Sequence, residues 1–138
     1  MKTNRTLTII LEKGDDELWG RINDPGFLLT SVGASVEEVT TNLRDLVADF
    51  LEHEGKDSPQ WNGIRETDIT YDIEYDLTAL FDVFKAIKIT SIAEIAGINA
   101  SLMRQYATGN KKPSARQAQR IESALRQLGE RLAHVSVA

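Results

Sequence analysis

Residues 91–101 read Ser-Ile-Ala-Glu-Ile-Ala-Gly-Ile-Asn-Ala-Ser, and this stretch decides how we interpret the second half of the chain. Ser91 followed by Glu94 has the spacing of a capping box at a helix start. Gly97 breaks the apolar run because glycine accepts a positive φ that other residues resist. Asn99 is a good N-cap for a helix from Ala100 to about Ala107. The stretch therefore predicts two short helices joined by a tight turn.

Helical periodicity surrounds this stretch on both sides. An apolar stripe runs from Leu77 to Ile87, Gly109 is a stop signal, and Pro113-Ser114 is a start signal for a last helix. The apolar positions of that last helix, which we expect to point inward, are Ala118, Ile121, Leu125, Leu128 and Leu132. Residues 77–138 are therefore predicted to form an all-α domain.

The first half of the chain alternates in the manner of strands. Residues 6–12, 18–22 and 27–32 predict three strands, separated by turn residues that include Asp24-Pro25-Gly26. Ser35 and Glu38 form a capping box before an amphipathic helix, residues 55–68 are typical of a loop, and residues 69–76 alternate strictly. We therefore expect an α+β protein with an α/β domain at 1–76 and a helical domain at 77–138.

Charge is divided unevenly between these two domains. Residues 1–76 contain 7 Lys and Arg against 17 Asp and Glu, a net charge of −10, whereas residues 77–138 contain 9 against 4, a net charge of +5. A polyanion is repelled by the first and attracted by the second. Any surface for nucleic acid is therefore expected after residue 76.

The helix that follows Asn99 carries the candidate base contacts. Small or hydrogen-bonding residues occupy one side of it, and arginine and glutamine bond guanine and adenine in bidentate fashion. Donors that suit phosphate oxygens follow this helix. The predicted DNA-binding residues are Asn99, Ala100, Ser101, Arg104, Gln105, Thr108, Asn110, Lys111 and Lys112, with Arg116 and Arg120 as further phosphate donors.

The second half resembles the Cro/C1-type (Xre-like) helix-turn-helix family over roughly residues 77–132. The resemblance rests on the run from Ile92 to Ser101 and on matching positions that follow it, which are Tyr106, Gly109, Pro113-Ser114, Ile121, Ala124-Leu125 and Leu128-Gly129. It implies a five-helix DNA-binding domain of the kind found in repressors. The resemblance would put base contacts on Ala100, Ser101, Arg104 and Gln105, and phosphate contacts around Asn99, Thr108 and Lys111. Because one such motif covers few base pairs, we expect a homodimer or higher homo-oligomer on double-stranded DNA.

The first half is similar to the HicB antitoxin family over about residues 5–76. The matching elements are Trp19, Pro25-Gly26, Gly33 and the helix start at residues 35–39. The resemblance implies a reduced ribonuclease-H-like ββαβ fold with an additional predicted strand. It also implies binding to a small basic HicA-like ribonuclease toxin, which the domain masks.

Several function classes are disfavoured. The chain has no cysteine, and its two histidines, His53 and His134, are isolated, so we expect no metal, no cofactor and no enzyme activity. Asp72, Glu74 and Asp76 lie on one face of a predicted strand, where they are either solvated or part of a surface for a basic partner. No apolar run approaches the ~20 residues of a membrane span, and we expect a cytoplasmic protein without a signal peptide.

The leading hypothesis is a sequence-specific repressor that serves as the antitoxin of a HicAB-like pair. A solitary DNA-binding regulator, with a ligand- or protein-binding first domain and no toxin, is the main alternative. A pure protein-interaction module and a metal-dependent nuclease remain as rivals.

Overall fold

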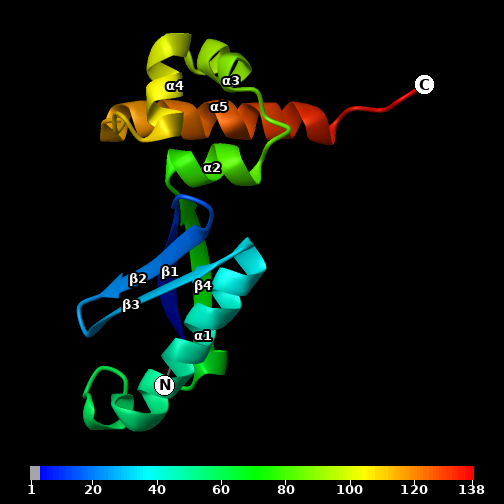
Figure 1. Ribbon diagram of the computed structural model, residues 1–138. Coiled ribbons are helices and arrows are strands. Elements are labelled where there is room, and N and C mark those ends of the chain that lie inside the picture. The colour runs from blue at the N-terminus through cyan, green and yellow to red at the C-terminus, as the bar shows by residue number, and fades with distance from the viewer. Residues whose placement is uncertain (1–3) are drawn as a thin grey trace. The chain divides into compact units, whose positions relative to one another are not determined.

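The computed structural model describes residues 4–138 and is α+β, as expected from the sequence (Figure 1). Its contacts divide the chain into two compact units, the first ending at Ala79 and the second beginning at Leu80. The sequence had placed the boundary between Asp76 and Leu77, so the division falls slightly later, within a helix. Each unit is described by itself below.

The first unit contains one four-stranded mixed sheet. Its strands are β1 (Arg5–Lys13), β2 (Leu18–Asp24), β3 (Phe27–Gly33) and β4 (Ile69–Tyr75), in the order β3-β2-β1-β4. β1 and β2 are antiparallel, as are β2 and β3, whereas β4 pairs with β1 in parallel. All four strands predicted from alternation are present.

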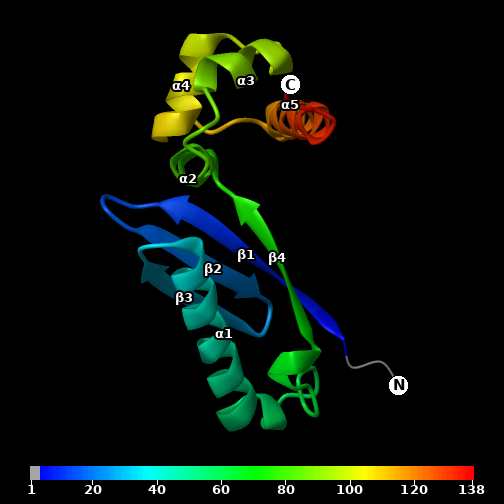
Figure 2. The ribbon, with the colours of Figure 1, turned by 90° about the vertical axis from the view of Figure 1, so that its right-hand side faces the viewer.

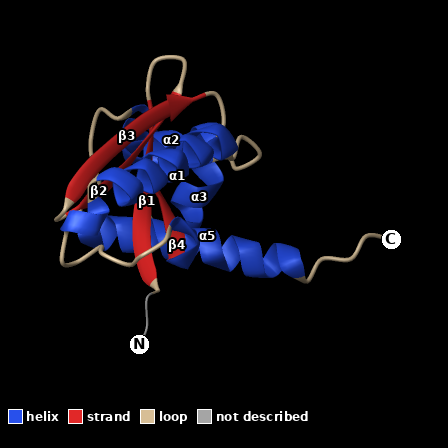
Figure 3. Ribbon diagram, turned by 90° about the horizontal axis from the view of Figure 1, so that it is seen from below, coloured by secondary structure: helices blue, strands red, loops and turns tan. Residues whose placement is uncertain are grey.

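Helix α1 (Val36–His53) covers one face of this sheet (Figures 2 and 3). Its apolar face is buried at Val39, Leu43 and Val47, which form the core together with Leu7, Ile9, Leu11 and Ile22, whereas Leu46 is 38% exposed. The start of the helix is capped by Ser35, whose Oγ accepts a hydrogen bond from the backbone N of Glu38 at 3.1 Å. The reciprocal bond of the predicted capping box is shifted by one residue, because the Glu38 carboxylate accepts from Ala34 N at 3.3 Å.

The connection from α1 to β4 is more ordered than a polar loop. It contains two 3-10 turns, η1 (Gly55–Asp57) and η2 (Glu66–Asp68). Between them Trp61 is buried with its ring edge-on to Phe27 and Phe50, at centroid distances of 5.5 and 6.4 Å. This aromatic contact holds the connection against the end of α1 and the sheet.

Strand β4 buries less than its alternation predicts. Ile69 is buried, but Ile73 is 38% exposed although its backbone pairs with that of the fully buried Ile9. The reason is position, because β4 is an edge strand and has a neighbour on one side only. Thr70, Asp72 and Glu74 are exposed.

The second half of the chain is helical, with α2 (Leu77–Val83), α3 (Ile89–Ala96), α4 (Ala100–Thr108) and α5 (Ala115–Ala133). Residues 77–138 thus form four helices, and the expectation of five is corrected. Residues 115–133 form one 19-residue helix, as the start signal at Pro113-Ser114 predicted, and the fifth helix that the resemblance implied is absent from residues 77–138. Helix α3 packs against both α4 and α5.

Three local predictions in this half are wrong. Helix α2 ends at Val83, and the apolar spacing that continues to Ile87 lies in a turn in which Ile87 N donates to Phe84 O. Helix α3 begins at Ile89 without a side-chain cap, so Ser91 is inside the helix and forms no capping box. The earlier start lets α3 complete about two turns before Gly97 ends it.

The inward stripe of α5 is also shorter than predicted. Ile121 and Ala124 are buried, but Ala118 is exposed and Leu132 is 61% exposed. The last turns of α5 extend past α3, so no element of the unit covers them (Figures 1 and 3). Within residues 4–138, no helix combines the length and the apolar character needed to cross a membrane.

Candidate nucleic-acid interface

The connection between α3 and α4 has only three residues, 97–99, and each has a defined role. Gly97 adopts φ 68°, the left-handed conformation predicted for it, and its backbone N–H bonds back to the carbonyls of Ala93 and Glu94. Ile98 is 7% exposed and anchors the turn in the core. Asn99 caps α4, since its Oδ1 accepts from Ser101 N at 2.8 Å and Leu102 N at 3.3 Å.

Helix α4 has one buried side and one accessible side. Met103 is fully buried and Tyr106 is 6% exposed, so these two residues attach α4 to the unit. Ser101, Arg104 and Thr108 are exposed on the opposite side, and Ala100 and Gln105 beside them are half-buried. The four predicted base-contact residues are therefore accessible on one helix.

The loop after α4 presents the predicted phosphate donors. Gly109 ends the helix at φ 82°, and Lys111 N then donates to Gln105 O at 3.2 Å, which folds the loop back onto α4. Asn99, Asn110, Lys111 and Lys112 are all exposed. The Thr108 hydroxyl is exposed but donates to Gln105 O at 3.3 Å, so it must rotate to reach an external group.

The charged side chains of this region are all positive. Residues 95–121 contain five Lys and Arg and no Asp or Glu. Among the residues that the structure describes, no carboxylate forms an ion pair with any of these five, which are Arg104, Lys111, Lys112, Arg116 and Arg120. The positive charge is therefore concentrated on α4, its following loop and the start of α5.

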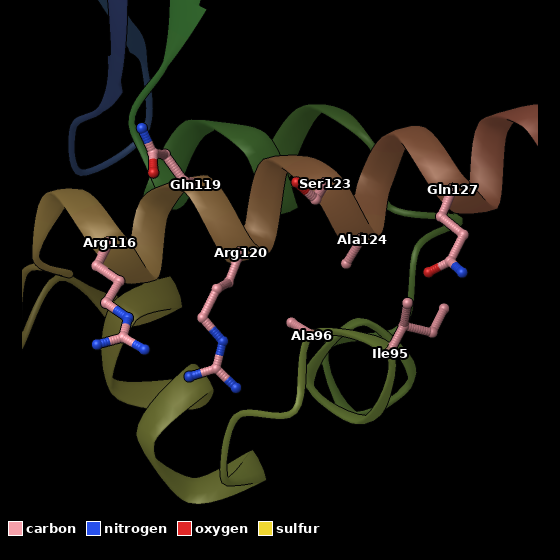
Figure 4. Close-up of a pocket in the computed structure, with 8 residues that line it drawn as sticks. All are labelled: Ile95, Ala96, Arg116, Gln119, Arg120, Ser123, Ala124 and Gln127. Atoms are coloured by element: carbon pink, nitrogen blue, oxygen red, sulfur yellow. The ribbon is translucent and has the colours of Figure 1, made fainter.

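Sequence reasoning missed a groove between α3 and α5 (Figure 4). It has a volume of about 460 Å³ and is lined by Ile95, Ala96, Arg116, Gln119, Arg120, Ser123, Ala124 and Gln127. Arg120 crosses to the turn, where its Nη2 donates to Gly97 O at 2.7 Å. The available signal was the four-residue spacing of Arg116 and Arg120, which puts both on one face of a helix.

The sheet face opposite α1 is accessible in the first unit. A Cβ on Gly20 would lie 2.5 Å from Val39 of α1, so Gly20 faces α1 and the adjacent Trp19 points to the other face, where it is 48% exposed. Trp19 borders a hollow of about 170 Å³ that is also lined by Ile10 and Thr30. The ion pair between Arg21 and Glu12, at 3.2 Å, lies at the same hollow.

The shifted pKa values lie in the first unit and have structural causes. Burial, and then the nearby Glu66 carboxylate, raises the pKa of Tyr71 to about 12. Burial, followed by Glu37, raises the pKa of Tyr75, and the backbone N–H of Arg65 lowers the pKa of Asp68. In residues 4–138, no three His, Asp or Glu side chains are grouped so that they could hold a metal ion.

Comparisons of the chain with known protein families, with curated proteins and with solved structures found no match. Geometry and charge are therefore the properties of the chain that bear on its function.

Proposed function

We propose that this chain is a DNA-binding regulator that inserts α4 into the major groove of double-stranded DNA. One observation carries the proposal. The 27 residues of the stretch 95–121 include no carboxylate, and their five cations have no ion-pair partner among the described residues. Cations that a protein does not neutralise itself attract a polyanion and release its counterions. The short α3, the three-residue turn and the accessible α4 have the form that a helix-turn-helix needs.

Within this proposal the exposed side of α4 reads bases. Arg104 and Gln105 supply the hydrogen bonds, and Ala100 and Ser101 are small enough to let the helix approach the base edges. The residues at the ends of the helix and in the loop position it on the backbone, namely Asn99, Thr108, Asn110, Lys111 and Lys112. Repression follows if the bound site overlaps a promoter, and a two-fold site would be bound by a homodimer or higher oligomer.

For the first unit we propose a protein partner of positive charge. The unit is strongly acidic, and Trp19 offers an exposed aromatic anchor on the uncovered sheet face. Its resemblance to HicB antitoxins makes a small basic ribonuclease toxin the leading candidate. A regulator without a toxin is the alternative, in which that sheet face is merely solvated.

The DNA-binding proposal is tested by fluorescence anisotropy of a labelled duplex from the protein's own upstream region. Lys111→Glu should reduce the slope of log K against log salt by at least about one unit, because a phosphate contact is lost. Lys56→Glu is the matched control, with the same charge change at an exposed site of the first unit. Absence of binding by the unmodified chain at low salt would refute the proposal, as would equal loss in both variants.

The partner proposal is tested by co-expression with the product of the adjacent gene. Co-purification that Trp19→Ala abolishes, while Leu46→Ala on α1 at the other side of the sheet leaves it intact, supports a partner at this face. A neighbouring gene that encodes no short basic protein, or a complex unaffected by Trp19→Ala, favours the solitary regulator.

A further inference from the structure

The groove between α3 and α5 has a lining that suits an anion (Figure 4). Its only ionisable groups are the guanidinium groups of Arg116 and Arg120. Neutral polar groups of Gln119, Ser123 and Gln127 complete the rim, and no carboxylate is present. Every charged group that lines the groove is therefore a hydrogen-bond donor, and none is an acceptor.

Arg120 is held in place beside the start of α4. Its Nη2 donates to Gly97 O at 2.7 Å and its Nη1 donates to Gln117 Oε1 at 2.9 Å. Both acceptors are neutral, so they orient the guanidinium without cancelling its charge. A guanidinium that is already fixed loses less conformational entropy when it binds an anion.

Arg116 lies one helical turn before Arg120 on the same face of α5. In Figure 4 both side chains extend from α5 toward the turn and α4. No carboxylate of the described chain pairs with Arg116. Two guanidinium groups at this spacing can share the oxygens of one phosphate or bind two adjacent phosphates.

The charge is balanced at the other end of the groove. The hollow that continues along α3 and α5 is lined by Ser91, Glu94, Ile95, Gln127 and Arg131. The Glu94 carboxylate offsets the charge of Arg131 there, so an anion is attracted more strongly to the Arg116 end, where two arginines have no carboxylate beside them. Because the groove is open and is lined by polar as well as apolar side chains, it fits a polymer backbone better than a small molecule.

We propose that the Arg116–Arg120 end of this groove binds a backbone phosphate that lies outside the bases contacted by α4. The inference rests on the proposed function and extends it, because it makes α5 a second phosphate anchor. DNA contacts then continue from the Lys111 loop, past the turn, and stop before Glu94.

The test compares variants of the full chain by anisotropy with the same duplex over a range of salt concentrations. Arg116→Ala should reduce the salt slope by about 0.9, the value for one phosphate. Gln119→Glu should weaken binding at low salt, because it adds a carboxylate to the groove without removing a side-chain hydrogen bond between residues of the described chain. Arg131→Ala, at the Glu94 end, and Arg126→Ala, whose partner is Glu122 at 2.8 Å, should both behave as the unmodified chain does.

The outcomes separate this inference from the proposed function. If Lys111→Glu loses affinity but Arg116→Ala and Gln119→Glu match the Arg131→Ala control, the groove inference is overturned and DNA binding stands. If the unmodified chain binds no duplex, both fail. The last measurement is a titration with inorganic pyrophosphate. If pyrophosphate binds the unmodified chain but not Arg116→Ala, and Arg116→Ala binds DNA as the unmodified chain does, the groove is a site for a free phosphate ligand and the inference is overturned.

Discussion

The two units use their arginines in opposite ways. Every arginine described in the first unit has a partner within it, and the contacts are Arg21 with Glu12, Arg44 with Glu66, Arg65 with Asp68, and Arg5 with the ring of Trp61. Of the arginines described in the second unit, only Arg126 forms an ion pair, with Glu122. Arg104, Arg116, Arg120 and Arg131 form none with the described carboxylates.

This difference separates charge that serves the fold from charge that is free for a partner. An exposed ion pair contributes only about 0–1 kcal/mol, so pairing adds little stability to the first unit. Its main effect is to neutralise the field that each cation produces. The second unit gives up this small gain around α4 and retains a positive field, which is what association with a polyanion requires.

The largest losses of stability are expected when a core side chain of either unit is truncated. Leu43→Ala in the first unit and Met103→Ala in the second each delete a fully buried side chain, and each should lower the free energy of unfolding by about 2–5 kcal/mol. Both tryptophans lie in the first unit, so tryptophan fluorescence should report the Leu43→Ala change and helical circular dichroism the Met103→Ala change. DNA affinity at a temperature where the variants remain folded should fall more for Met103→Ala. Equal effects on both probes from either variant would contradict separate cores.

An intermediate effect is expected at two glycines with positive φ, one in each unit. Gly63→Ala and Gly97→Ala should each cost about 1–2 kcal/mol in thermal denaturation, since L side chains are strained in the left-handed region. Nothing lies near a Cβ at position 63, whereas a Cβ at position 97 would be 2.8 Å from Arg120 Nη2. We therefore expect only Gly97→Ala to weaken DNA binding. A loss of affinity in Gly63→Ala would show that the effect is due to stability alone.

The smallest effect on stability is expected at Tyr71, which lies near the Arg44–Glu66 ion pair of the first unit. Its folded pKa of about 12 exceeds the ordinary value of about 10, so the protonated phenol favours folding. This contribution is complete below pH 10 and is lost as the pH rises from 10 to 12. Tyr71→Phe should remove that part of the pH dependence in denaturant unfolding curves. Glu66→Gln should lower the phenol pKa measured by ultraviolet titration, and an unchanged value would mean that burial alone raises it.

Local signals in the sequence predicted much of the fold. Alternation at residues 6–12 and 69–76 predicted strands, and Ser35, Asn99, Gly109 and Ser114 were placed correctly at helix ends. These signals succeed because capping and alternation depend on residues within a few positions of one another. The Ser91–Glu94 spacing misled because the same pair also fits the interior of a helix that starts earlier.

The candidate site could be predicted only in part, because local signals do not report contacts between residues far apart in the chain. The accessibility of Ser101 and Arg104 followed from the helical period once α4 was assigned. The groove could not be found, because it depends on Arg120 meeting Gly97, which is 23 positions away. The exposure of Leu132 was missed because apolar spacing does not show where the neighbouring helix ends.

The amino-acid sequence by itself determined the α+β class, the helix ends that carry a cap or a glycine stop, and the separation of negative from positive charge, since composition, periodicity and caps are local properties. Tertiary structure alone decided which cations remain unpaired and which side chains line the α3–α5 groove. Both depend on distances between elements, and such distances are set by packing between residues far apart in the chain.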